Sequence, residues 1–292
     1  MKKLKNYIKL IRIKHYFKNI LIFLPLVFSG ELLKLDKLSS AIIGFISFSL
    51  ISSVVYIIND LKDIESDRLH DVKKNRPLAS GKIKPINAII LAVIFLISSV
   101  SLNFLIIDVN VINIVGYIML YLLINIGYSF GLKKKPIVDI VILVAGFLIR
   151  VLYGSGINNI ELSNWLYLTI IAGSFYMGLG KRRNEILKQG TKSREVLKSY
   201  NKEFLNNNMY MCLSLCIVFY SLWSVDPNTI SRINSNLLIW TVPILMVILM
   251  KYSLNIEGDS QGDPVDVLFG DKILLGLVAL LGLCLFSLIY LI

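Results

Sequence analysis

Long apolar runs are the feature that most constrains this 292-residue chain. Each run is close to the ~20 residues that an α-helix needs to cross a bilayer. Only 17% of the residues are charged, whereas soluble chains carry about a quarter. A soluble enzyme, a secreted disulfide-rich domain and a disordered chain are therefore excluded. Because the runs are continuous rather than alternating, the sequence predicts an all-α, polytopic membrane protein and argues against a β-barrel.

The runs predict nine transmembrane helices in a single domain that covers residues 1–292. The predicted spans are residues 18–33, 39–59, 85–107, 109–130, 137–154, 164–180, 208–225, 236–253 and 272–292. The first span is short and contains Pro25. A basic, amphipathic segment over residues 1–17 precedes it, and we expect this segment to lie on the anionic inner surface of the membrane.

The distribution of basic residues predicts the orientation of the chain. Of the 31 Lys and Arg residues, 27 fall in the N-terminal tail and in alternate loops, and only 3 fall in the loops between them. Loops rich in Lys and Arg remain in the cytoplasm. We therefore expect a multi-pass protein of the cell (cytoplasmic) membrane with a cytoplasmic N-terminus. The net charge of +12 then belongs to these loops, and no nucleic-acid partner is expected.

A cluster of oxygen-bearing side chains directly follows the second predicted span. It consists of Asn59, Asp60, Asp63 and Asp67. On a helix that continued past the span, these side chains would share an arc of about 100°. Carboxylates so close together repel one another and need a cation near lipid. Mg²⁺ that shares its coordination with substrate phosphates fits this need, whereas the alternative is a solvated acidic loop balanced by nearby basic residues.

Two stretches around this cluster resemble motifs of the UbiA superfamily of intramembrane prenyltransferases. Residues 59–67 read N-D-L-K-D-I-E-S-D and match its N-D-x-x-D-x-x-x-D motif, and residues 73–81 match its K-x-x-R-P-L-A-S-G pattern. Arg12, Lys18 and Asn19 resemble its opening motif. The resemblance implies a bundle of nine helices, a central cavity open to the cytoplasm, a lateral lipid portal and a diphosphate held by Mg²⁺.

A second polar cluster follows the sixth predicted span. Typical members of the superfamily have D-x-x-x-D there, but this chain has G-K-R-R-N-E over residues 180–185. Lys181, Arg182 and Glu185 share one face of a helix. Two cations and one carboxylate suit a phosphomonoester, and the alternative is a basic helix end that snorkels to the membrane surface. The pattern resembles the polyprenyl-phosphate phosphoribosyltransferase branch, as does Asp139.

This branch implies transfer of 5-phosphoribose from phosphoribosyl diphosphate to a polyprenyl phosphate, which yields a lipid-linked cell-wall precursor. The resemblance assigns catalysis to Asp60, Asp63 and Glu185, and Mg²⁺ binding to Asn59, Asp60, Asp63 and Asp67. It assigns substrate binding to Lys18, Lys73, Arg76, Tyr128, Lys133, Arg150, Lys181 and Arg182. Two alternatives remain open: prenyl transfer from a polyprenyl diphosphate to an aromatic or glycerol-phosphate acceptor, and transport of small anions.

Overall fold

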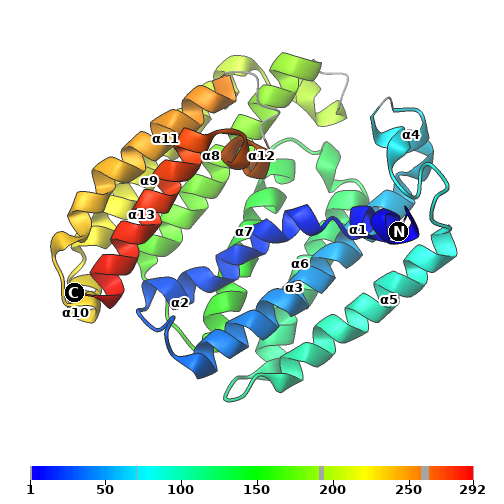
Figure 1. Cartoon of the computed structure of the whole chain (residues 1–292). Helices are drawn as coiled ribbons and strands as arrows, with labels where there is room; N and C mark the ends of the chain where they lie inside the picture. Colours follow the sequence, from blue (N-terminus) through cyan, green and yellow to red (C-terminus); the bar gives the residue numbers. More distant parts are fainter. Residues whose placement is uncertain (1, 71, 191–193, 258–262, 292) are drawn as a thin grey trace. The chain divides into compact units, whose positions relative to one another are not determined.

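The computed structural model describes residues 2–70, 72–190, 194–257 and 263–291 (Figure 1). All regular structure in these ranges is helical, which confirms the predicted fold class. The chain divides into two compact units, and the prediction of a single domain stays a prediction. Unit 1 comprises Met1–Leu26, Lys34–Leu132 and Ile149–Asn159, and unit 2 comprises Val27–Leu33, Lys133–Leu148 and Ile160–Ile292.

Unit 1 is built around one long helix, α3. The α-helices of this unit are α1 (Lys2–Ile11), α3 (Leu35–Lys62), α4 (Ile64–Arg68), α5 (Pro85–Leu102), α6 (Val111–Ser129) and the end of α7 (Val138–Asn158). Its 3-10 helices are η1 (Ile13–Phe23), η2 (Lys73–Asn75) and η3 (Asn103–Leu105). α3 packs against α1, η1, α5 and α6. Small side chains such as Ser47 let the helices approach closely, and Ser47 Oγ donates a hydrogen bond to the carbonyl oxygen of Ser99 at 2.8 Å.

Unit 2 contains the remaining helices. These are α8 (Asn164–Gln189), α9 (Lys202–Val225), α10 (Pro227–Ile233), α11 (Val242–Glu257), α12 (Pro264–Gly270) and α13 (Lys272–Tyr290), with the start of α7 and the 3-10 helices η4 (Leu132–Lys134), η5 (Glu195–Ser199) and η6 (Leu237–Thr241). α2 (Leu24–Phe28) joins the two units in sequence. In unit 2, α8 lies along α9, and α11 contacts both α9 and α13. These contacts bury an apolar core that includes Tyr176, Met209 and Ile256.

Seven of the nine predicted spans coincide with helices long and apolar enough to cross a membrane. Over the span 164–180 the chain is helical, as part of α8, but α8 is not among these seven. Residues 18–33 do not form one α-helix: η1 ends at Phe23 and the five-residue α2 follows, with Pro25 in its first turn. Proline fits only the first turn of a helix, so Pro25 marks a new start. The count of nine spans and their orientation stay predictions.

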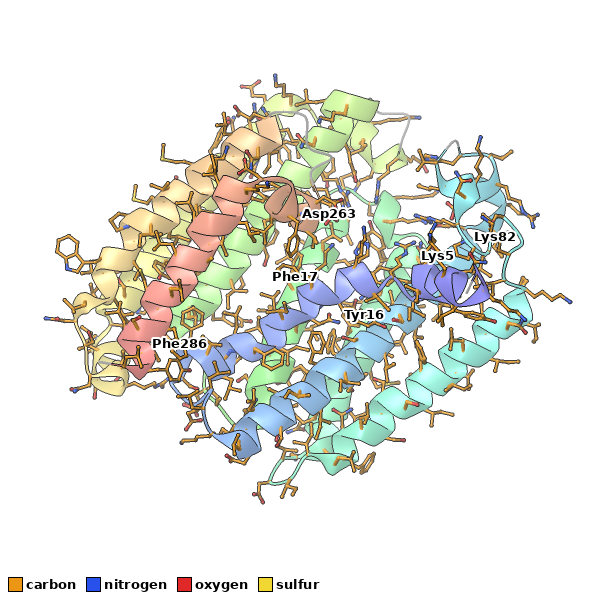
Figure 2. All side chains as sticks on the ribbon, in the orientation of Figure 1. Lys5, Tyr16, Phe17, Lys82, Asp263 and Phe286 are labelled. Atoms are coloured by element: carbon orange, nitrogen blue, oxygen red, sulfur yellow. The ribbon has the colours of Figure 1, made fainter. Side chains whose placement is uncertain are left out.

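The basic N-terminal segment forms an α-helix that ends earlier than its amphipathic pattern predicts. α1 stops at Ile11 because Arg12 adopts a left-handed backbone conformation, with φ of 55° and ψ of 51°. Leu10 is buried in the core of unit 1, whereas Lys5, labelled in Figure 2, and Lys9 are exposed. The helix therefore has one face on the protein and a basic face away from it.

Candidate active site

The first polar cluster is carried by two helices, so the continuous helix considered for residues 59–67 is interrupted. α3 ends at Lys62 and α4 begins at Ile64. The backbone N–H of Asp63 still donates to the carbonyl oxygen of Asn59 at 3.0 Å, but Asp63 has a ψ of 10°, which turns the chain. Asn59 and Asp60 therefore lie on α3 and Asp67 lies on α4, with Asp63 half-buried between the helices.

Arginine side chains hold Asp60 and Asp67 together. Both carboxylates are buried, with 3% and 4% of their residue surface exposed. Arg76 donates from one nitrogen, Nη1, to Asp60 Oδ1 at 3.1 Å and to Asp67 Oδ2 at 2.7 Å. Arg12 donates to the same oxygen of Asp60 at 2.6 Å. Two guanidinium groups thus neutralise two carboxylates that would otherwise be strongly disfavoured at this depth.

Asn59 belongs to a neighbouring set of contacts at the end of α6. Ser129 Oγ donates to Asn59 Oδ1 at 3.2 Å. Lys62 donates to the carbonyl oxygen of Ser129 at 2.7 Å and stacks over the ring of Phe130, 3.7 Å from its centroid. Of the four predicted metal ligands, the structure therefore brings Asp60 and Asp67 onto a common partner and connects Asn59 with α6.

The Asp60–Asp67 pair fits a metal ion that also binds substrate. Mg²⁺ prefers carboxylate oxygens and keeps several positions for water or phosphate. Asp60 Oδ1 and Asp67 Oδ2 both contact Arg76 Nη1, so the two carboxylates lie close enough together to share one small cation. Across the described part of the chain, no group of three or more His, Cys, Asp or Glu side chains is arranged to hold a metal ion. The donor set thus suits a shared site rather than a complete protein cage.

Arg150 lies deep in unit 1 and contacts Asn19, a residue of the predicted opening motif. Its Nε donates to Asn19 Oδ1 at 2.7 Å, and its Nη2 donates to the hydroxyl of Tyr121 at 3.1 Å. The guanidinium also lies over the rings of Tyr121 and Phe48, at 4.8 and 5.0 Å. The structure thereby joins two residues, Asn19 and Arg150, that are far apart in the sequence. Other predicted substrate-binding residues are half-buried on η1, η2, α6 and η4: Lys18, Lys73, Tyr128 and Lys133.

The second polar cluster lies at the end of α8, and its central member is buried. Lys181, Arg182 and Glu185 lie on this one helix, as predicted. Only 1% of the Arg182 side chain is exposed. Its Nε donates to Asp139 Oδ2 at 2.6 Å, and its Nη1 donates to Glu185 Oε2 at 2.8 Å. Arg182 therefore bridges two carboxylates and has almost no surface through which to meet a ligand.

Tyr200 connects this network to the segment after α8, and no sequence pattern had singled it out. Its hydroxyl donates to Asp139 Oδ1 at 2.6 Å and accepts from the backbone N–H of Ile137 at 2.5 Å. Burial, with the neighbouring Asp139 carboxylate, raises the pKa of Tyr200 to about 12. Ile137 has a φ of 67°, which is rare for a β-branched residue and strained. Tyr200 thus anchors a strained turn. The same segment after α8 also carries Arg194, whose Nε lies 3.4 Å from Glu185 Oε2.

Lys181 is the accessible cation of this helix face. About a quarter of its side chain, 26%, is exposed, and it donates to Asp263 Oδ2 at 3.1 Å. Asp263, labelled in Figure 2, also caps α12 by accepting from the backbone N–H of Val265 at 3.1 Å. The sequence of this helix face predicts more positive than negative charge, with two cations and one carboxylate. The structure adds Asp139 and Asp263, which balance Lys181 and Arg182.

Comparison with known proteins places this geometry in context. Residues 21–269 match the UbiA prenyltransferase family. The chain is 31% identical to the decaprenyl-phosphate phosphoribosyltransferase of Corynebacterium glutamicum, over 97% of this chain and 86% of that protein. It is 29% identical to the decaprenyl-phosphate phosphoribosyltransferase of Mycolicibacterium smegmatis, over 91% of this chain and 87% of that protein.

A solved structure supports the fold independently. The chain aligns with a UbiA homolog from Archaeoglobus fulgidus bound to GPP and Mg²⁺, with a TM-score of 0.69. The alignment covers 97% of this chain and 99% of the other, at 17% sequence identity. At this identity the likeness concerns the arrangement of the helices alone.

Proposed function

The chain belongs to the UbiA prenyltransferase family, and on that premise we propose that it transfers 5-phosphoribose from phosphoribosyl diphosphate to a polyprenyl phosphate such as decaprenyl phosphate. The products are polyprenyl-phosphoryl-5-phosphoribose and diphosphate. The reaction takes place at the cytoplasmic face of the cell membrane, where the basic loops are expected.

The observation that carries this proposal is identity of about 30% with decaprenyl-phosphate phosphoribosyltransferases over more than nine-tenths of the chain. The composition of the second cluster agrees with it. Two acidic residues would suit a second metal-bound diphosphate, whereas Lys181 with the Arg182–Glu185 pair suits a single phosphate group. The 5-phosphate of the ribosyl donor is such a group.

In this proposal the first cluster holds the diphosphate end of the donor. Asp60 and Asp67 are the carboxylates that would hold Mg²⁺, with Asn59 and Asp63 beside them. When bound, Mg²⁺ would neutralise the negative charge that develops on the departing diphosphate. Arg76 contacts both carboxylates through Nη1, and the other donors of its guanidinium fork can bind phosphate oxygens. Lys73 lies three residues before Arg76 and would add a second positive charge near the diphosphate.

In unit 2, Lys181 is the residue that would contact the phosphomonoester. Its side chain is partly exposed and its donor group already binds one anion, Asp263. Arg182 acts through its neighbours instead, because it is enclosed by Asp139 and Glu185. We therefore assign Arg182 the role of positioning Glu185, which would accept a hydrogen bond from a ribose hydroxyl.

The chemical step needs no dedicated base. A phosphate oxygen of the lipid attacks C1 of ribose while the bond from C1 to diphosphate breaks, and diphosphate leaves with the bonding electrons. The attacking phosphate is already anionic at pH 7, so no side chain has to remove a proton from it. The cations of each cluster would instead stabilise negative charge on the phosphate groups that they contact.

One experiment separates this reaction from ordinary prenyl transfer. Purified protein with Mg²⁺ is given either phosphoribosyl diphosphate with polyprenyl phosphate, or polyprenyl diphosphate with an aromatic or glycerol-phosphate acceptor. Lipid products are identified by mass. We expect a phosphoribosylated lipid from the first mixture only. Product from the second mixture alone would replace the proposal by prenyl transfer, and uptake of small anions into vesicles without either product would favour a transporter.

A further inference from the structure

Arg12 has an unusual backbone conformation next to a proposed metal ligand. Left-handed backbone at a non-glycine residue is uncommon and carries strain, and here it separates α1 from η1. The guanidinium of Arg12 lies over the ring of Tyr56, with Cζ 4.7 Å from the centroid. From there its Nη2 reaches Asp60 Oδ1 at 2.6 Å. The strained turn and the aromatic ring together hold a cation on this one oxygen.

We propose that Arg12 is a placeholder for the metal ion, which must release Asp60 before a divalent cation can bind. Asp60 is 3% exposed, and a carboxylate so deeply buried needs a positive partner at all times. Arg12 supplies one such partner. A divalent cation on Asp60 Oδ1 would lie within a few ångströms of the guanidinium, and the two positive charges would repel each other. Arg12 and the metal ion therefore compete for the same oxygen.

Arg12 is better suited to leave than Arg76, the other arginine on Asp60. Arg76 bridges Asp60 and Asp67 through one nitrogen, so its departure would expose two carboxylates. Among the described residues Arg12 makes one ion pair, to Asp60, and its release leaves a carboxylate that Arg76 still contacts. Once free, its guanidinium can bind the anion that accompanies the metal ion. Loss of Arg12 should therefore tighten the binding of metal alone and weaken the binding of a diphosphate donor.

The test is a titration of the purified full chain with Mn²⁺ alone, with free Mn²⁺ followed by electron paramagnetic resonance. Arg12→Gln removes the competing charge, and we expect it to raise the affinity for Mn²⁺ by about fivefold or more. Lys14→Gln is the matched control, because Lys14 is exposed two residues along the chain and the substitution changes the net charge equally. We expect the control to shift the affinity less than twofold.

A second variant covers the case in which Arg12→Gln does not fold. Arg12→Lys keeps the charge but loses the planar group that stacks on Tyr56, and it should bind Mn²⁺ more tightly than the wild type, by a smaller factor. If the folded variants bind Mn²⁺ no more tightly than the wild type, the competition does not exist. This inference rests on the metal site of the proposed function but not on the donor. Because the titration contains no donor, it can succeed or fail independently of the product assay.

Discussion

At the scale of single residues, the sequence indicated which side chains matter but not what surrounds them. Lys181, Arg182 and Glu185 were expected on one helix face, and they lie there. Their partners could not be anticipated from local pattern, because Asp139 is 43 residues from Arg182 and Asp263 is 82 residues from Lys181. Tyr200 lies in a loop without periodicity. Only the packed structure separates an accessible lysine from an enclosed arginine.

Lys181→Ala tests the accessible cation. We expect donor affinity to fall by about 10- to 100-fold, the equivalent of one charge-assisted contact of roughly 1.5–3 kcal/mol, with little change in stability. Lys188→Ala is the control, because Lys188 is an exposed lysine of the same helix. The measurement is titration with phosphoribosyl diphosphate. Equal donor affinity in the two variants would show that Lys181 does not contact the donor.

Arg182→Met tests the enclosed cation. Methionine is similar in length but leaves Asp139 and Glu185 without their shared partner, and breaking a buried ion pair in this way costs about 3–5 kcal/mol. We expect the free energy of unfolding in mild denaturant to fall by that order. Arg194→Met should lose less than ~1 kcal/mol, because Arg194 is 37% exposed and 3.4 Å from Glu185. A stable Arg182→Met protein with weakened donor binding would show that Arg182 contacts substrate directly.

At the scale of elements, the hydrophobic runs located the helices and missed where some of them break. Hydropathy does not encode the break between α3 and α4 at Asp63 or the 3-10 form of η1. By contrast, the run 109–130 became helix α6 (Val111–Ser129) with little change in its limits. Long apolar helices are specified locally, whereas polar junctions depend on tertiary partners.

Gly154→Ala tests a close contact between two elements of unit 1. A Cβ at Gly154 of α7 would collide with the backbone carbonyl of Ile22 in η1, and that backbone cannot move aside as a flexible side chain would. Such overpacking costs about 1–3 kcal/mol. Gly116→Ala on α6 is the control, because nothing lies within 4 Å of the added atom. Thermal unfolding should separate the two, and equal melting temperatures would contradict the contact.

The stability of the first turn of α13 should depend on pH, because Asp271 caps this helix. This carboxylate accepts from the backbone N–H groups of Ile273 and Leu274 at 2.8 and 2.9 Å. Hydrogen bonds from Lys251 and from the backbone N–H of Leu274 lower the pKa of Asp271 to about 2. A lowered pKa means that the cap stabilises the fold fully above about pH 4 and loses this effect as the pH falls toward 2. Proteolysis of the wild type and of Asp271→Asn should differ at pH 5 and converge near pH 2.

At the scale of the whole molecule, the distribution of basic residues predicts which loops lie on each side of the membrane. The alternation of basic and charge-poor loops along the chain favours nine spans. It does not reveal that the first predicted span is partly 3-10 helix or that the end of α8 carries a buried ion network. Charge bias reports which side of the membrane a loop occupies, and packing decides how the spans are built.

Labelling of single cysteines tests this topology. In a variant whose three native cysteines are replaced by alanine, Lys74→Cys is predicted to be cytoplasmic and Arg232→Cys external, and both positions are exposed. A membrane-impermeant maleimide applied to intact cells should label the cysteine at position 232 and reach the one at position 74 only after lysis. The reverse pattern would invert the orientation, and labelling of both in intact cells would change the number of spans between them.

The balanced ion network around Arg182 also limits how a chain of this kind can change over generations. Arg182 is the shared partner of Asp139 and Glu185, so a substitution of Arg182 alone takes this partner from two buried carboxylates. A lineage that exchanges this cationic site for an acidic one must alter two positions together or pass through a less stable ancestor. The effect of each substitution then depends on which other substitution came first, and strong epistasis among these three positions follows directly from their burial.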